Sequence, residues 1–284
     1  MPLVVVLIIL IILIINILIA NTNKDLTIEN LKETNTQLQK QVDTKNTFNS
    51  LTNQLFNQLH YFDNAPIKEK FNVENYKQII NGAYTDRADP KKIQDTYIPQ
   101  MQAELKTVTD LKIQMSTELT KKPTTALDDT LNDIMKGFSK IYYYSPAAGY
   151  CINPLAEAEA CVYSKTPQIV YINMNTKANT VSTYGETFAN WYMKGVVIHE
   201  TAHVLQDINP IATKVVLPTF NDNREFMADC LVATIYSTDF PKYAYGHLCD
   251  SNQQKVINKW LTTIMWKTPT IIQGKTHSLL RQIS

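Results

Sequence analysis

Residues 195–206 decide what this chain can be, and they read Gly-Val-Val-Ile-His-Glu-Thr-Ala-His-Val-Leu-Gln. The apolar residues around the polar ones predict a helix that is held in a core. His199 and His203 are four residues apart, so on a helix both rings lie on one face and can bind one metal ion. Glu200 is placed to take a proton from a water molecule at that metal. The alternative is a pair of histidines on a helix flank beside a solvated glutamate.

A catalytic zinc ion needs a third protein ligand, and residues 223–230 supply the best candidate. They read Asn-Arg-Glu-Phe-Met-Ala-Asp-Cys and precede an apolar stretch typical of a helix. Glu225 and Asp229 lie four apart on one face, so Glu225 can bind Zn²⁺ while Asp229 accepts a hydrogen bond from a ligating histidine. This spacing is similar to that of the gluzincins, whereas the HxxGxxH continuation of the metzincins is absent after His203. The alternative is an ordinary helix with two surface acids.

The N-terminal segment is strongly apolar. Residues 3–20 contain no charge and only one polar interruption, Asn16, and as a helix they extend about 27 Å, enough for a bilayer core. A cleavable signal peptide is the main alternative, but no Lys or Arg precedes the run and bulky Leu18 disfavours cleavage after Ala20. A buried core helix is the other. We therefore expect an uncleaved, single-pass membrane anchor that contacts the lipid bilayer.

Residues 21–122 are polar and helical in pattern, and they carry no recognisable chemistry. Apolar residues at heptad spacing predict a membrane-proximal stalk or a short coiled coil, through which the chain can form a homo-oligomer; they are Ile28, Leu31, Leu38 and Val42. A solvated amphipathic helix is the alternative. Asp89-Pro90 predicts a helix start, and Pro99 predicts a kink. The expected division is an anchor at 1–20, a helical region at 21–122 and a catalytic domain at 123–284.

Composition excludes several classes of function. The 284 residues carry a net charge of only +1, which argues against a nucleic-acid partner because phosphate binding needs concentrated positive charge. The chain contains 7 glycines and neither GxGxxG nor GxxxxGK[ST], so dinucleotide enzymes and P-loop NTPases are not expected.

The two motif blocks together resemble a known family. "HETAHVLQ" at 199–206 and "REFMADC" at 224–230 resemble the HExxHxxQ and ELQADC blocks of the neutral zinc metallopeptidases, which typically bear an N-terminal membrane segment. Two weaker blocks, at 149–174 and 245–260, also resemble the family and occur in the order that the family shows. The resemblance covers roughly residues 140–266 and implies an α+β, predominantly helical, zincin-like fold with peptidase activity. The sequence departs from the family pattern at Ala202, Met227, Gly246 and Leu248.

The weaker blocks suggest further roles. By the resemblance, His247 donates a hydrogen bond to the oxyanion of the reaction, with Tyr243 and Tyr245 as rivals from the same segment. The strand expected around Tyr171 either offers an edge that binds extended substrate or lies buried in the core. The resemblance also favours a disulfide between Cys151 and Cys161, with free buried thiols as the alternative.

The sequence therefore predicts a membrane-anchored zinc metallopeptidase that hydrolyses peptide or protein substrates. A disulfide would place its catalytic domain on the extracytoplasmic or lumenal side. A catalytically silent metal-binding module tethered to the membrane is the alternative from another class, although a structural zinc site needs no base such as Glu200. A zinc hydrolase that acts on non-peptide substrates also fits the spacing.

Overall fold

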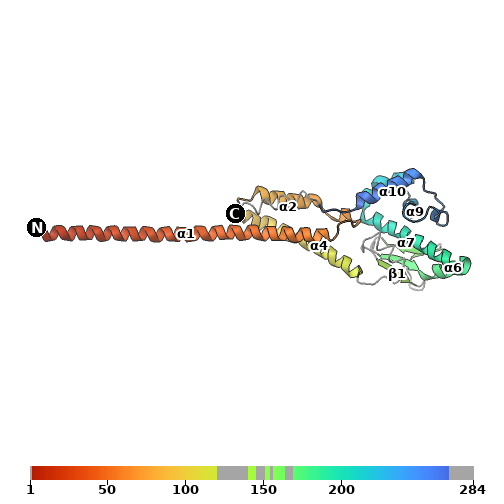
Figure 1. Ribbon diagram of the computed structural model, residues 1–284, viewed down its shortest axis with the longest axis horizontal. Coiled ribbons are helices and arrows are strands. Elements are labelled where there is room, and N and C mark those ends of the chain that lie inside the picture. The colour runs from red at the N-terminus through yellow and green to blue at the C-terminus, as the bar shows by residue number, and fades with distance from the viewer. Residues whose placement is uncertain (1, 120–139, 145–150, 154–155, 164–168, 269–284) are drawn as a thin grey trace. The chain divides into compact units, whose positions relative to one another are not determined.

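The computed structural model describes residues 2–119, 140–144, 151–153, 156–163 and 169–268. Within these ranges the chain is predominantly helical, with one three-stranded and one two-stranded sheet, which confirms the expected helix-dominated architecture with a minor β component (Figure 1). The chain divides into two compact units. The described parts of the first are residues 2–53 and 77–102, and those of the second are residues 54–76 and 103–268 with the gaps given above.

The helical elements follow one another along most of the chain. They are α1 (Pro2–His60), η1 (Lys68–Lys70), α2 (Val73–Thr85), α3 (Pro90–Lys92), the π-helical turn η2 (Ile93–Tyr97), α4 (Ile98–Leu119), α6 (Met174–Tyr184), α7 (Glu186–Ile208), α8 (Pro210–Val216), η4 (Leu217–Phe220), α9 (Arg224–Ile235), η5 (Phe240–Lys242) and α10 (Ser251–Ile264).

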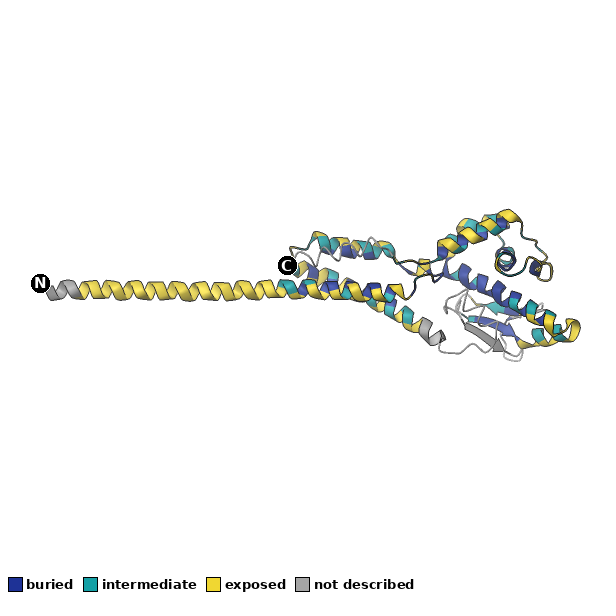
Figure 2. Ribbon diagram, in the orientation of Figure 1, coloured by how far each residue is buried: buried dark blue, intermediate teal, exposed yellow. Residues whose placement is uncertain are grey.

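Helix α1 contains the apolar N-terminal run. Its large apolar side chains between Leu7 and Ile19 are each 48–61% exposed, and no part of the helix's most apolar window is buried by the described chain (Figure 2). This exposure contradicts a buried core helix. The helix is long and apolar enough to cross a membrane.

The first unit has a small core contributed by α1, α2 and the start of α4. Its buried apolar residues are Phe48, Ile79, Ile80, Ala83, Ile93, Ile98 and Met101. Asp89 caps α3 as the sequence predicts, because its side chain accepts a hydrogen bond from Lys92 N at 2.9 Å and Pro90 occupies the first helical position. The expected disturbance at Pro99 takes the form of the π-helical turn η2, since proline lacks the N–H that would continue regular hydrogen bonding.

The second unit includes part of the region that the sequence assigned to a separate stalk. Residues 54–76 belong to this unit. Trp266 N donates to Ala65 O at 2.9 Å, and Asn64 N donates to Trp266 O at 2.9 Å. Backbone pairing about two hundred residues apart therefore joins the end of α1 to the segment after α10. The predicted boundary at residues 122–123 lies outside the described residues.

The three-stranded sheet has the order β1-β5-β4. Strand β5 (Ile169–Asn173) pairs in parallel with β1 (Lys140–Tyr144) and antiparallel with β4 (Ala160–Val162). The strand around Tyr171 is therefore central, which contradicts the expectation that it offers a free edge to substrate. A central strand buried on both faces explains its Ile- and Val-rich sequence. The short hairpin β2 (Ile152–Asn153) and β3 (Ala156–Glu157) forms the second sheet.

Helix α7 is the central element of the second unit. It packs against β4, β5 and α6, and it also contacts α9 (Figure 1). Its second half is buried almost all round, from Gly195 to Gln206 with only His203 partly exposed. Gly195 is required here because a Cβ at that position would lie 2.1 Å from Cδ2 of Phe240 in η5. The HExxH segment is therefore held rigidly in a core, as the sequence predicts.

Two disulfides cross-link the second unit. Cys151 and Cys161 are joined, with their Cα atoms 5.6 Å apart, which confirms the expected bridge. Cys230 in α9 and Cys249 before α10 form a second bridge, which leaves no free cysteine in the chain. The alternative of free buried thiols is therefore wrong.

Candidate metal centre

Helix α7 and helix α9 bring three metal-binding side chains together. His199 Nε2 lies 3.2 Å from His203 Nε2, and Glu225 Oε2 lies 3.0 Å and 3.1 Å from these two nitrogens. Ligand atoms placed tetrahedrally about 2.1 Å from a zinc ion would lie about 3.4 Å apart, so the observed triangle has nearly that size. The group can hold a metal ion, and its members are the three residues expected from the sequence.

The start of α9 positions Glu225. Asn221 and Asp222 both adopt left-handed backbone conformations, which turn the chain before the helix begins. Asn223 then caps the helix by accepting hydrogen bonds from Glu225 N at 2.9 Å and Phe226 N at 3.3 Å. The carboxylate of Glu225 therefore projects from the first helical turn, where negative charge is stabilised by the helix dipole.

A second set of contacts orients the imidazole of His199. Its Nδ1 lies 2.8 Å from Oδ1 of Asp229, whose side chain is fully buried. A carboxylate oxygen accepts hydrogen bonds, so Nδ1 of the imidazole is assigned as the donor in this contact. The Nε2 lone pair is thereby directed toward the metal-binding group, which is the role expected for Asp229.

Gln206 orients the imidazole of His203 in the same way. Oε1 of Gln206 lies 3.0 Å from His203 Nδ1 and also accepts from Arg224 Nε at 2.8 Å. The amide nitrogen of Gln206 donates to the carbonyl oxygen of Arg224 at 3.1 Å, which fixes which end of the amide faces the histidine. Arg224 is held in turn by Asp207 at 2.5 Å. The sequence did not predict this network, although Gln206 is the glutamine of the HExxHxxQ pattern, three residues after His203.

The electrostatics of the group favour a cation. Two ring nitrogens and a carboxylate oxygen converge. Their lone pairs repel one another unless positive charge lies between them. Burial favours neutral His199, but hydrogen bonds to Asp229 and Glu225 outweigh burial and raise the pKa of His199 to about 10. Burial opposes ionisation of Glu225, yet hydrogen bonds from both histidines hold its pKa far below the usual value. The donor set of two imidazoles and one carboxylate fits a zinc ion.

Glu200 stands beside the metal-binding group without belonging to it. Its side chain is buried, and burial raises its pKa above the ordinary glutamate value, although the two nearby histidines partly oppose the shift. It lines a cavity of about 370 Å³ together with His199. A carboxylate with a raised pKa that faces a cavity beside a metal site is suited to accept and release a proton.

Four aromatic residues contribute to the wall of the cavity. Tyr192 of α7 and three residues of the segment after α9 contribute to it, namely Phe240, Tyr243 and Tyr245. Tyr245 stacks on His199, with ring centroids 5.6 Å apart, and its backbone N–H donates to Asp229 Oδ2 at 3.3 Å. Tyr245 is 59% exposed, but its partial burial and the adjacent Glu225 both raise the pKa of its phenol, which stays protonated at neutral pH. Of the three candidates in this segment, Tyr245 has the most contacts with the metal-binding group.

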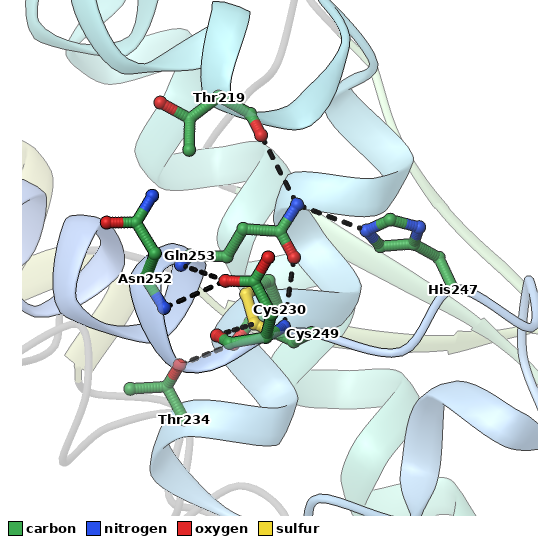
Figure 3. Close-up of a disulfide and its surroundings, with 8 residues drawn as sticks. Thr219, Cys230, Thr234, His247, Cys249, Asn252 and Gln253 are labelled. Carbon is green, nitrogen blue, oxygen red and sulfur yellow. Dashed lines mark hydrogen bonds between the residues drawn. A yellow bond between two sulfur atoms is a disulfide. The ribbon is translucent and has the colours of Figure 1, made fainter.

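His247 occupies a different position from the one expected. Its ring stacks on Phe226 at 4.3 Å, and its Nε2 lies 3.4 Å from Nε2 of Gln253. Among the described residues it makes no hydrogen bond to the three metal-binding side chains, and it does not line the cavity beside Glu200. Figure 3 shows Gln253 between His247 and Thr219. The side-chain amide of Gln253 donates a hydrogen bond to the carbonyl oxygen of Thr219 at 3.2 Å. Its oxyanion role therefore lacks support from the contacts.

The disulfide between Cys230 and Cys249 explains how this segment is held. It ties residue 249 back to α9, five residues beyond Glu225 (Figure 3). Asp250 then begins α10 with a capping box, in which its side chain accepts from Gln253 N and Gln253 Oε1 accepts from Asp250 N. The segment that carries Tyr245 is thus fixed at both ends.

Tyr171 is not a member of the metal-binding group. It is 8% exposed, belongs to a small core with Cys151, and packs edge-on against Tyr163 with ring centroids 5.3 Å apart. It does not line the cavity beside Glu200. Its burial agrees with the buried-strand alternative, and none of these contacts supports a role in substrate binding.

The described chain thus defines a predominantly helical protein with a membrane-compatible N-terminal helix and a His-His-Glu group that can hold a metal ion. No family model matches the sequence, and neither the curated proteins nor the solved structures contain a significant match.

Proposed function

We propose that this protein is a zinc-dependent peptidase that is anchored in a membrane by residues 3–20. The observation that carries the proposal is the convergence of His199, His203 and Glu225, together with a cavity that His199 and the buried side chain of Glu200 both line. A structural metal site needs its ligands only. A proton-accepting carboxylate directed into a cavity is what a hydrolytic site requires in addition.

The chain's own residues divide the chemistry among them. A zinc ion held by the three side chains would supply Lewis acidity and lower the pKa of a water molecule. Glu200 accepts the proton of the attacking water and passes it to the leaving nitrogen of the peptide bond. Asp229 and Gln206 keep both imidazoles in the orientation that presents Nε2 to the metal.

Tyr245 is the residue best placed to stabilise negative charge in the transition state. Its ring lies against His199, it lines the cavity with Glu200, and its protonated phenol is a hydrogen-bond donor. The disulfide between Cys230 and Cys249 and the hydrogen bond to Asp229 restrict its movement. We therefore assign the oxyanion role to Tyr245 in place of His247.

Fold and family are part of the same proposal. The small sheet packed against the helix that carries HExxH, with the third ligand on a later helix, supports a zincin-like fold and the resemblance to the neutral zinc metallopeptidases. The exposed apolar side chains of Ile28, Leu31 and Leu38 in α1 support association of stalks into a homo-oligomer.

Two disulfides support an extracytoplasmic or lumenal location of the second unit, because disulfides persist in oxidising compartments. Thiol labelling of intact cells, before and after permeabilisation, tests this topology. Labelling of all four cysteines without prior reduction, and only after permeabilisation, would place the site in the cytosol and contradict the assignment.

The function is tested by incubating the zinc-loaded full-length protein in detergent with an unbiased peptide library. Cleavage by the wild type, lost in Glu200→Gln while the metal is retained, is the expected result. Glu225→Gln is expected to lose both metal and cleavage. Retained metal with no cleavage of any peptide by the wild type would favour a catalytically silent module.

A further inference from the structure

The cavity beside Glu200 contains a second carboxylate that the proposed chemistry does not use. Glu159 precedes β4 and lines the cavity together with Tyr192 and Phe240. It is not a member of the metal-binding group. A charged residue in the wall of a substrate cavity affects which substrates bind, so its surroundings are informative.

The position of Glu159 is fixed by its backbone and its side chain. Its carbonyl oxygen accepts a hydrogen bond from Asn173 N at 2.9 Å, at the end of β5. Its Oε2 accepts a hydrogen bond from the hydroxyl of Tyr192 at 2.7 Å, and Tyr192 is buried in α7. Glu159 is an exposed residue at the cavity, and the hydrogen bond from the neutral Tyr192 hydroxyl leaves its negative charge uncompensated by that contact.

No lysine, arginine or histidine of the described chain forms an ion pair with Glu159. Four aromatic rings also line the cavity, those of Tyr192, Phe240, Tyr243 and Tyr245, and the remaining wall includes small apolar side chains. A carboxylate combined with aromatic faces attracts a cation, by charge and by cation–π interaction. The volume of about 370 Å³ lies near the lower end of the range for small-ligand sites, so the cavity is large enough to admit an extended Lys or Arg side chain.

We propose that this cavity is a specificity pocket for a cationic group of the substrate, and that Glu159 is the residue that selects it. The inference rests on the proposed peptidase function, because Glu200 and His199 line the same cavity. The cationic group is the ammonium or guanidinium of a Lys or Arg side chain next to the cleaved bond, or the amino terminus of the substrate. These two sources share one chemistry and are separated by blocking the amino terminus.

The test compares two matched peptide libraries, one with free amino termini and one with acetylated termini, using zinc-loaded full-length protein in detergent. We expect Lys and Arg to be enriched at one constant position relative to the cleaved bond. Enrichment in both libraries identifies a side chain, whereas cleavage confined to the free library, one residue from its end, identifies the terminal ammonium.

The variants then assign the preference to Glu159. Glu159→Gln should reduce kcat/KM about 10-fold for a Lys-containing peptide and less than 2-fold for the same peptide with norleucine in place of Lys. Glu159→Lys should shift the preference toward Asp or Glu at that position. Glu186→Gln is the matched control, because Glu186 is exposed at the start of α7, pairs with Lys177 at 3.3 Å and does not line the cavity.

The outcomes separate this inference from the function on which it rests. Cleavage by the wild type with no preference for a cationic group, or equal losses for the Lys and norleucine peptides in Glu159→Gln, would overturn the specificity pocket alone. Failure of the zinc-loaded wild type to cleave any peptide would overturn the proposed function and the pocket assignment together. Metal content measured for each variant confirms that the catalytic site is unchanged.

Discussion

The disulfide between Cys230 and Cys249 gives a prediction whose size follows from the structure. The bridge closes a loop with a sequence separation of 19, and in the chain-entropy relation such a loop stabilises the folded state by about 3.2 kcal/mol. The bridge between Cys151 and Cys161 has a separation of 10, which corresponds to about 2.7 kcal/mol. Replacing Cys230 and Cys249 by Ala together should therefore cost slightly more than the same change at the other bridge.

Tryptophan fluorescence is a suitable assay because all three tryptophans, Trp191, Trp260 and Trp266, lie in the second unit. For a unit of this size, a loss of about 3.2 kcal/mol lowers Tm by about 6–13 °C. The double variant should also show faster hydrogen exchange in residues 237–250, which carry Tyr245, with no change in residues 54–76. The double Cys151/Cys161 variant is the control, with a Tm loss but no change in residues 237–250.

Two results would refute this reasoning. The first is a Tm within about 2 °C of the wild type, after mass spectrometry has established that the wild type contains the bridge. The second is unchanged exchange in residues 237–250, because the bridge would then not restrict the segment that brings Tyr245 to the site.

The remaining predictions concern the site and its support. Asp229→Asn should weaken metal affinity by about 10- to 100-fold in a chelator competition, whereas Asp239→Asn, at an exposed ion pair, should change it less than 2-fold. Equal effects of the two changes would contradict the role of Asp229. Gly195→Ala should destabilise the protein by about 1–3 kcal/mol because the new methyl group meets the ring of Phe240. Addition of Phe240→Leu should recover part of that loss in thermal denaturation, and no recovery would be inconsistent with a local clash.

The metal-binding group could be predicted from sequence because its geometry depends on local periodicity. His199 and His203 share a helix face through their spacing, and so do Glu225 and Asp229. The spacing within each helix did not show that α7 and α9 pack together. The requirement of zinc for a third ligand was sufficient to select Glu225.

The features that sequence analysis missed depend on contacts between distant segments. Glu159 reaches the cavity because β4 pairs with β5, and that register is not visible in a run of three residues. The choice of Tyr245 over His247 depends on a loop conformation fixed by the bridge from Cys249 to α9. The sequence left an edge strand and a buried core strand open for Tyr171, because a short apolar strand does not reveal whether both of its neighbours are occupied.

The two compact units of the structure also differ from the division expected from sequence. The polar, helical composition of residues 21–122 suggested one continuous accessory region. Backbone hydrogen bonds between Ala65 and Trp266 assign residues 54–76 to the second unit, although nothing in the local sequence marks that pairing. A change in composition predicts a domain boundary only where few long-range contacts cross that point of the chain.

The central claim is that His199, His203 and Glu225 hold one catalytic zinc ion, and metal analysis of the purified full-length protein tests it most directly. After expression in zinc-replete medium, the wild type and Glu200→Gln should each contain about one zinc per chain, and His199→Ala and His203→Ala should contain almost none. The claim would be contradicted by a metal-free wild type, or by histidine variants that keep their full zinc content.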